Sequence, residues 1–183
     1  MRMGVLKNTV LALAIAAALI TPALAREFTD DEKTGLADAI EKFDAAMKAS
    51  DFNTVVDASI SPKLMTAMAT TYKVPADQLK TMVVAQMTQA MQTVKIDSYG
   101  MDIDNADYEE AADGTPYALV PSVVVMEVGG KKVKSSGSTL AIIDDGKWYL
   151  LNVGQKDQVA MLKSVYTSFA DVTFPEAKME AAQ

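Results

Sequence analysis

The spacing of the apolar residues changes near residue 94 from the period of a helix to the period of a strand, and this change sets the fold class. Between residues 29 and 93 apolar side chains recur every three or four positions, as at Leu36, Ile40 and Phe43, which is typical of helices with one buried face. From Val94 onward, β-branched and aromatic residues follow a period of two, which is typical of strands. The pattern predicts an α+β domain with N-terminal helices packed on a curved, four-stranded antiparallel sheet.

Start signals divide the helical part into four segments. Thr29 opens a capping box, and Asp51 can cap a short second helix. Ser61-Pro62 supplies an N-cap followed by proline at the first helical position, and Pro75 begins a fourth helix. A further helix is expected after the sheet, at about 155–168.

Two glycine-containing turns predict the pairing of the strands. The strands themselves are expected at about 94–104, 116–128, 131–143 and 147–153. Gly129-Gly130 and Asp145-Gly146 fill two-residue connections, where type I′ turns need positive φ at both central positions. The resulting register places Glu127 opposite Lys132, a pair of opposite charge. We therefore interpret Asp144-Asp145 as a hairpin corner with its carboxylates in solvent, and not as a catalytic or metal-binding pair.

The predicted register gives the sheet two different faces. One face is almost wholly apolar and includes Tyr117, Leu140, Ile142, Tyr149 and Leu151. The other mixes small and polar residues with one large aromatic, and its candidate binding residues are Trp148, Asn152, Thr139 and Ser122. A sheet with two apolar faces needs cover on both sides, and we expect helices one to four to cover only one. Cover for the second face is expected from protein, either the last helix, a second copy or a client, ahead of a small ligand.

The chain contains no histidine and no cysteine. Serine–histidine and cysteine–histidine pairs are therefore impossible, and the usual ligands of zinc, haem and copper are missing. The acidic run at 102–110 does not match a calcium-binding EF-hand loop, because Glu110 stands where the turn glycine is needed. We expect no cofactor and no metal, and a catalytic alternative would depend on Asp97, Tyr99 or Tyr117.

The N-terminal segment has the three parts of a secretory signal peptide. Arg2 and Lys7 precede an apolar run at 10–20, and Ala23-Leu24-Ala25 provides a cleavage site. The run is shorter than the roughly twenty residues that span a bilayer. We predict a signal peptide at 1–25, a single domain at 26–174 and a flexible tail at 175–183, in a bacterial periplasm or secreted. The absence of cysteine argues against a lipid anchor at the cleavage site.

The charge of the exported chain limits its partners. Removal of the signal would leave 15 basic and 24 acidic residues, and such a surface repels phosphate backbones. We expect no nucleic acid and no membrane partner after signal removal. A protein partner or a homodimer is expected first, and a small apolar ligand second.

Two segments resemble the NTF2-like superfamily, which includes SnoaL-like proteins and exported members of unknown role. The run LADAIEKFDAAMKASDFNTVVD resembles the family's opening helix, acidic break and second helix. The run STLAIIDDGKWYLLNV resembles its closing hairpin, in which Trp148 matches a frequent tryptophan. The resemblance implies a cone-shaped α+β domain. The family's enzymes commonly use Asp and His, and this chain has no histidine, so we carry over no catalytic residue. We expect a non-enzymatic binding or accessory protein that acts through the sheet face or the cone pocket. The alternative is a carboxylate- or tyrosine-based isomerase or hydrolase.

Overall fold

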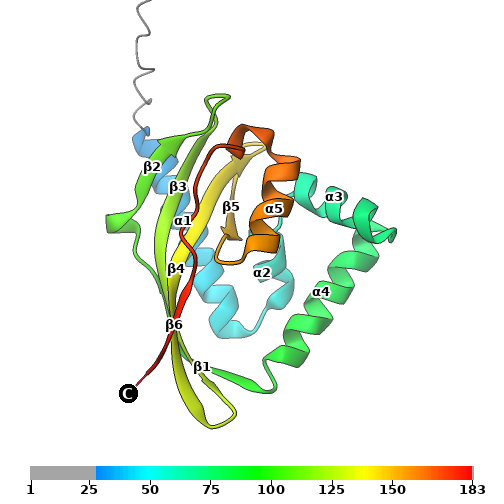
Figure 1. The fold of residues 1–183 in the computed structure, drawn as a ribbon, viewed down its shortest axis with the longest axis vertical. Coiled ribbons are helices and arrows are strands. Elements are labelled where there is room, and N and C mark those ends of the chain that lie inside the picture. The colour runs from blue at the N-terminus through cyan, green and yellow to red at the C-terminus, as the bar shows by residue number, and fades with distance from the viewer. Residues whose placement is uncertain (1–27, 183) are drawn as a thin grey trace, which may run out of the picture.

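The computed structural model describes residues 28–182, and it has the α+β architecture in which helices precede a curled antiparallel sheet (Figure 1). The expected signal peptide falls on residues outside this range. The helices are α1 (Asp30–Ala49), α2 (Phe52–Ser59), α3 (Pro62–Tyr72), α4 (Ala76–Ala90) and α5 (Lys156–Val165). The strands are β1 (Val94–Met101), β2 (Asp107–Glu110), β3 (Pro116–Val128), β4 (Lys131–Asp144), β5 (Lys147–Asn152) and β6 (Lys178–Ala181). Two 3-10 turns are η1 (Ile103–Asn105) and η2 (Thr167–Phe169).

The sheet has six strands within the described residues, so the expected count of four is corrected. The central order is β1-β3-β4-β5, with β2 also paired to β3 and β6 also paired to β4. The first predicted strand ends early because Asp102 caps η1, accepting a hydrogen bond from the Asn105 N–H at 3.2 Å.

β6 lies within the segment 175–183, for which the sequence predicts a flexible tail. β5 pairs with β4 only from Thr139 to Asp144, which leaves the edge of the first half of β4 open. β6 pairs along that edge between Val133 and Ser136. A covered edge is protected from pairing with other chains.

The predicted turns and register are confirmed. Glu127 pairs with Lys132, and the register runs without interruption from Tyr117–Ile142 to Val128–Lys131. Both turn pairs have positive φ, at 58° and 77° for Gly129 and Gly130 and at 50° and 72° for Asp145 and Gly146. The helix starts are also confirmed, since the capping box at Thr29 and the caps at Asp51 and Ser61 are all present.

Each face of the sheet is covered by helices of the same chain. On the face that carries Trp148, α1 buries Leu36, Ile40 and Phe43 against Val120 and neighbouring strand residues. On the opposite face, α3, α5 and η2 cover Tyr117, Ile142 and Leu151 with side chains that include Leu64, Leu162 and Phe169. The expectation that helices one to four cover a single face is wrong, because the chain turns after α2 and carries α3 to the other side.

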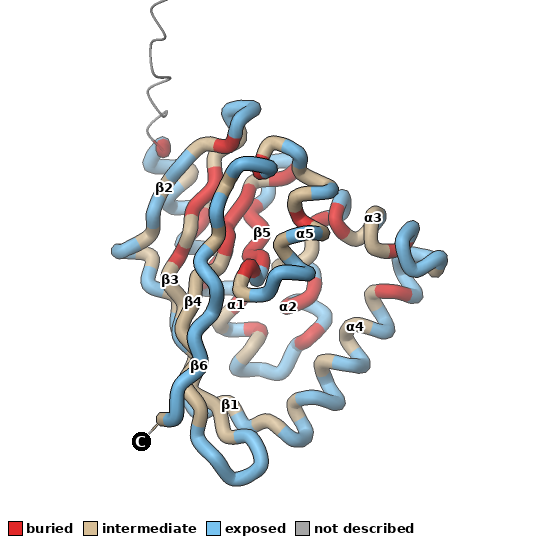
Figure 2. Tube along the Cα trace, in the orientation of Figure 1, coloured by how far each residue is buried: buried red, intermediate tan, exposed pale blue. Residues whose placement is uncertain are grey.

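One helix remains largely outside both cores. α4 contacts α2 and α3, and its one buried residue is Leu79, near its N-terminus. Figure 2 shows mostly exposed and half-buried residues along α4, whereas the buried residues gather in the upper sheet. α4 therefore stands away from the sheet and leaves space between them.

Candidate functional site

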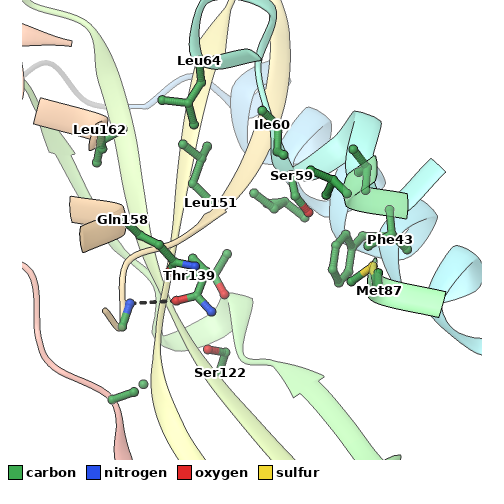
Figure 3. Close-up of a pocket in the computed structure, with 18 of the residues that line it drawn as sticks. Phe43, Ser59, Ile60, Leu64, Met87, Ser122, Thr139, Leu151, Gln158 and Leu162 are labelled. Carbon is green, nitrogen blue, oxygen red and sulfur yellow. Dashed lines mark hydrogen bonds between the residues drawn. The ribbon is translucent and has the colours of Figure 1, made fainter. Parts of the chain in front are cut away.

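A cavity of about 660 Å³ occupies the space between the sheet and helices α2, α4 and α5 (Figure 3). We call it the central cavity. Its wall is mostly apolar, with side chains from all five helices and from the strands, among them Phe43, Met47, Ile60, Leu64, Met87 and Leu151. Ligand sites in proteins are commonly concave, apolar and of this size.

Polar side chains gather on one side of the central cavity. Ser122 comes from β3, Thr139 from β4, Asn152 from the end of β5 and Gln158 from α5. The Oδ1 atom of Asn152 accepts a hydrogen bond from the N–H of Gly154 at 2.8 Å, which fixes the plane of the amide group. This side of the cavity therefore offers hydroxyl and amide groups to a bound molecule.

Three of the four predicted binding residues meet at the central cavity. Ser122, Thr139 and Asn152 line it together, as their shared face of the sheet predicts. Trp148 does not line it. The residue is 8% exposed, its indole stacks with the Phe28 ring at 6.2 Å between centroids, and it packs against α1.

The position of Trp148 also explains a glycine within a helix. A Cβ atom on Gly35 would lie 3.1 Å from Nε1 of Trp148, which is closer than most real contacts. Helix α1 thus approaches the sheet closely at this point, and Trp148 belongs to the core.

Four methionines whose sequence pattern favours core filling over a binding groove lie in the wall of the central cavity. Met47, Met68, Met87 and Met161 all line the central cavity and are half-buried. Their spacing is the ordinary spacing of core residues, so the sequence pattern favours core filling. Their flexible side chains can adapt to ligands of different shape.

Tyr99 stands in the wall between the central cavity and a second cavity. The second cavity has a volume of about 550 Å³ and carries the charged residues Asp44, Lys48 and Asp97. Burial, together with the nearby charge of Asp44, raises the pKa of Tyr99 well above its ordinary value, against a smaller effect of a hydrogen bond with Thr139. Tyr99 is therefore a neutral hydroxyl at physiological pH.

Asp44 is partly desolvated. Its Oδ1 atom is buried and has no hydrogen-bond partner among the described residues. Burial raises the pKa of Asp44, and the charge of Lys48 lowers it by less. The negative charge of Asp44 acts on Tyr99, and the nearby Lys48 offsets only part of it.

The three residues considered for catalysis do not converge. Tyr99 lines both cavities, whereas Asp97 lines only the second cavity and forms ion pairs with Lys132 at 3.2 Å and Lys95 at 3.5 Å. Tyr117 is buried in the opposite core, where its hydroxyl donates a hydrogen bond to Glu109. Tyr99 and Asp97 thus share the second cavity, and Tyr117 lies apart from both.

Asp144 is buried, although the sequence predicts that its carboxylate points into solvent. It pairs in register with Lys147 as predicted, but the residue is only 4% exposed. Its Oδ1 atom lies 2.7 Å from Nζ of Lys63, and its Oδ2 atom accepts a hydrogen bond from the Tyr166 hydroxyl at 2.9 Å. That hydroxyl also shares a short hydrogen bond with Ser61. We call these four residues the Asp144 cluster.

The Asp144 cluster joins distant parts of the chain. Ser61 caps α3, Tyr166 follows α5, and Asp144 ends β4. Burial alone would raise the pKa of Asp144, but hydrogen bonds from Lys63 and Tyr166 outweigh this effect and hold the pKa below its ordinary value. Ser61 is fully buried, so its hydroxyl cannot reach a substrate. We interpret the cluster as a structural connection, whereas Asp145 is the exposed turn residue that the sequence predicts.

The described residues offer neither a cluster of metal ligands nor a membrane-spanning helix. Among residues 28–182, acidic side chains do not group in threes as a metal site would need. Within the same range, no helix combines the length and hydropathy of a membrane span. Comparisons with protein-family models, curated proteins and solved structures find no match for this chain.

Proposed function

We propose that this protein is an exported, periplasmic or secreted, non-enzymatic protein that binds a small apolar molecule in the central cavity. The observation that carries this proposal is the cavity of about 660 Å³ with a mainly apolar wall and one polar side. This combination is typical of sites that bury most of a ligand and orient it through a few polar groups.

The surroundings of the cavity favour binding over chemistry. Of the titratable residues considered for catalysis, only Tyr99 lines it, and its raised pKa keeps the hydroxyl protonated. Among the described residues, the one carboxylate in the wall is Asp157, which is exposed at the start of α5. A general base needs a pKa near the working pH and a position within hydrogen-bond reach of the substrate. The proposal therefore places recognition, and no reaction, in the central cavity.

This proposal puts a small apolar ligand ahead of a protein partner, the reverse of the order expected from the sequence. Helices of the same chain already cover both faces of the sheet, and the central cavity remains between the sheet and helices α2, α4 and α5. Association with a protein partner or a second copy stays a prediction for the outer surface. We also propose that the domain belongs to the NTF2-like superfamily, supported by helices that precede a curled sheet and enclose a cavity with it.

A titration with N-phenyl-1-naphthylamine, an apolar dye that fluoresces when it leaves water, tests the proposal. The wild-type protein should bind the dye saturably. Ser122→Phe places a ring in the cavity and should weaken binding at least about tenfold, which corresponds to 1.4 kcal/mol. Val123→Phe is the matched control, because Val123 is the next residue of the same strand, is 38% exposed and does not line the cavity.

Circular dichroism should show that both variants are folded. Equal dye affinities for Ser122→Phe and wild type would place the binding site elsewhere. A wild-type protein that binds no dye would remove the proposed function. Intrinsic fluorescence is a poor readout here, because Trp148 lies in the core and outside the cavity wall.

A further inference from the structure

The wall of the central cavity contains no lysine and no arginine among the described residues that line it. Its one charged residue is Asp157, in the first turn of α5. A carboxylate, sulfate or phosphate bound here would therefore have no cationic partner in the wall and an acidic neighbour at its edge.

The polar groups that are present are uncharged. Ser122, Thr139 and Gln158 lie together on one side in Figure 3, while Phe43 and Met87 lie on another. Hydroxyl and amide side chains can both donate and accept hydrogen bonds, so they suit hydroxyl, carbonyl or amide groups of a ligand. Polar residues such as Ser59 and Gln86 also line the cavity from α2 and α4, but hydroxyl and amide groups are most concentrated on the side of the sheet and α5. This concentration suits a molecule with one polar end.

The electrostatic surroundings disfavour a bound anion. Moving an ionised group out of water is unfavourable unless the group is paired and hydrogen-bonded. Tyr99, in the same wall, already has a raised pKa from burial and from the charge of Asp44. Both effects act against any negative charge next to this hydroxyl.

We propose that the ligand of the central cavity is an uncharged amphiphile, with an apolar body against the helices and a hydroxyl, carbonyl or amide group at Ser122, Thr139, Asn152 and Gln158. This inference rests on the proposed function and adds the chemical class of the ligand. It excludes free fatty acids and other anionic amphiphiles as preferred ligands.

Competition against the bound dye tests the inference with three probes of equal chain length, dodecanol, dodecanoate and dodecylammonium, at pH 7.5. Dodecanol is kept below its solubility limit, and the two ionic probes are kept below their micelle concentrations. Dodecanol should displace the dye with an affinity at least about tenfold higher than that of dodecanoate. An equal or higher affinity for dodecanoate overturns the inference and leaves the proposed function standing. Tightest binding of dodecylammonium also overturns it, because the site would then select a cation. Absence of dye binding by wild type removes the proposed function itself.

A designed change of selectivity gives an independent test. Gln158→Lys introduces a cation at the polar side and should raise the affinity for dodecanoate relative to that for dodecanol at least about tenfold. Ala160→Lys is the matched control, since it adds the same charge on an exposed position of α5 outside the cavity wall. Equal ratios of dodecanoate to dodecanol affinity for the two variants would overturn the placement of the polar end.

Discussion

Replacement of Asp144 by asparagine should destabilise the fold, whereas the same replacement of the adjacent Asp145 should not. Asp144 is 4% exposed and bonds Lys63 and Tyr166, whereas Asp145 is exposed at the turn. Asparagine tolerates the positive φ of 50° at position 145. The two variants thus differ in the surroundings of the carboxylate and not in the chemical change.

The expected magnitude follows from the bonds of the cluster. A hydrogen bond to a charged group contributes about 1.5–3 kcal/mol, and a neutral one about 0.5–1.5 kcal/mol. The ion pair adds no more than about 1 kcal/mol, because the Lys63 side chain is 62% exposed. Asparagine also avoids the cost of burying a charge, so Asp144→Asn should lower the free energy of unfolding by about 1–2 kcal/mol. The melting temperature should fall by roughly 2–8 °C in a chain of this size.

The effect should depend on pH. The pKa of Asp144 is lower in the folded protein than in the unfolded chain, so its contribution is complete above the ordinary carboxyl pKa of about 3.9. It is lost as the pH falls through the lower folded pKa. The difference in stability between wild type and Asp144→Asn should therefore be constant from pH 8 to about pH 5 and should close below about pH 4.

Urea unfolding followed by circular dichroism at pH 7, 5 and 3.5 measures these differences. Asp145→Asn should stay within about 0.5 kcal/mol of wild type throughout. Equal stabilities for Asp144→Asn and wild type at pH 7 would show that the cluster contributes nothing to the fold. A difference that grows toward acid would refute the sign of the pKa argument.

Three further predictions concern the cores and the tail. Trp148→Ala should lower the free energy of unfolding, measured in urea, by about 3–5 kcal/mol. The dye affinity should stay within about threefold of wild type, because the indole lies outside the cavity wall. A large loss of affinity in the folded variant would contradict this placement. Leu162→Ala should cost about 2–5 kcal/mol in the same assay, since the side chain is 2% exposed, and a neutral effect would show that α5 is not part of the core. Gly154→Leu should detach β6, because a Cβ atom there would lie 2.8 Å from the Cβ of Ala177; hydrogen exchange at 178–181 should accelerate, and unchanged protection would argue against this contact.

Much of the fold could be predicted because it depends on residues that are close in sequence. The capping box at Thr29 involves residues three positions apart, and the turn at Gly129-Gly130 determines its own φ values. The hairpins then carry the register outward from their turns, which is why Glu127 and Lys132 were paired correctly. The predicted association of Ser122, Thr139 and Asn152 also follows from this register.

The placement of the helices depended on the whole chain. Trp148 and Thr139 share a face of the sheet, but α1 closes over the first and leaves the second beside the cavity. The sequence alone determined the period of each segment, its caps, its turns and the strand register, because these depend on residues close in the chain. Only the tertiary structure decided that Asp144 is buried and that a cavity exists, because both need distant segments to meet. Ser61 and Tyr166, for example, are 105 positions apart, and their contact depends on the curl of the sheet and the packing of helices on its two faces.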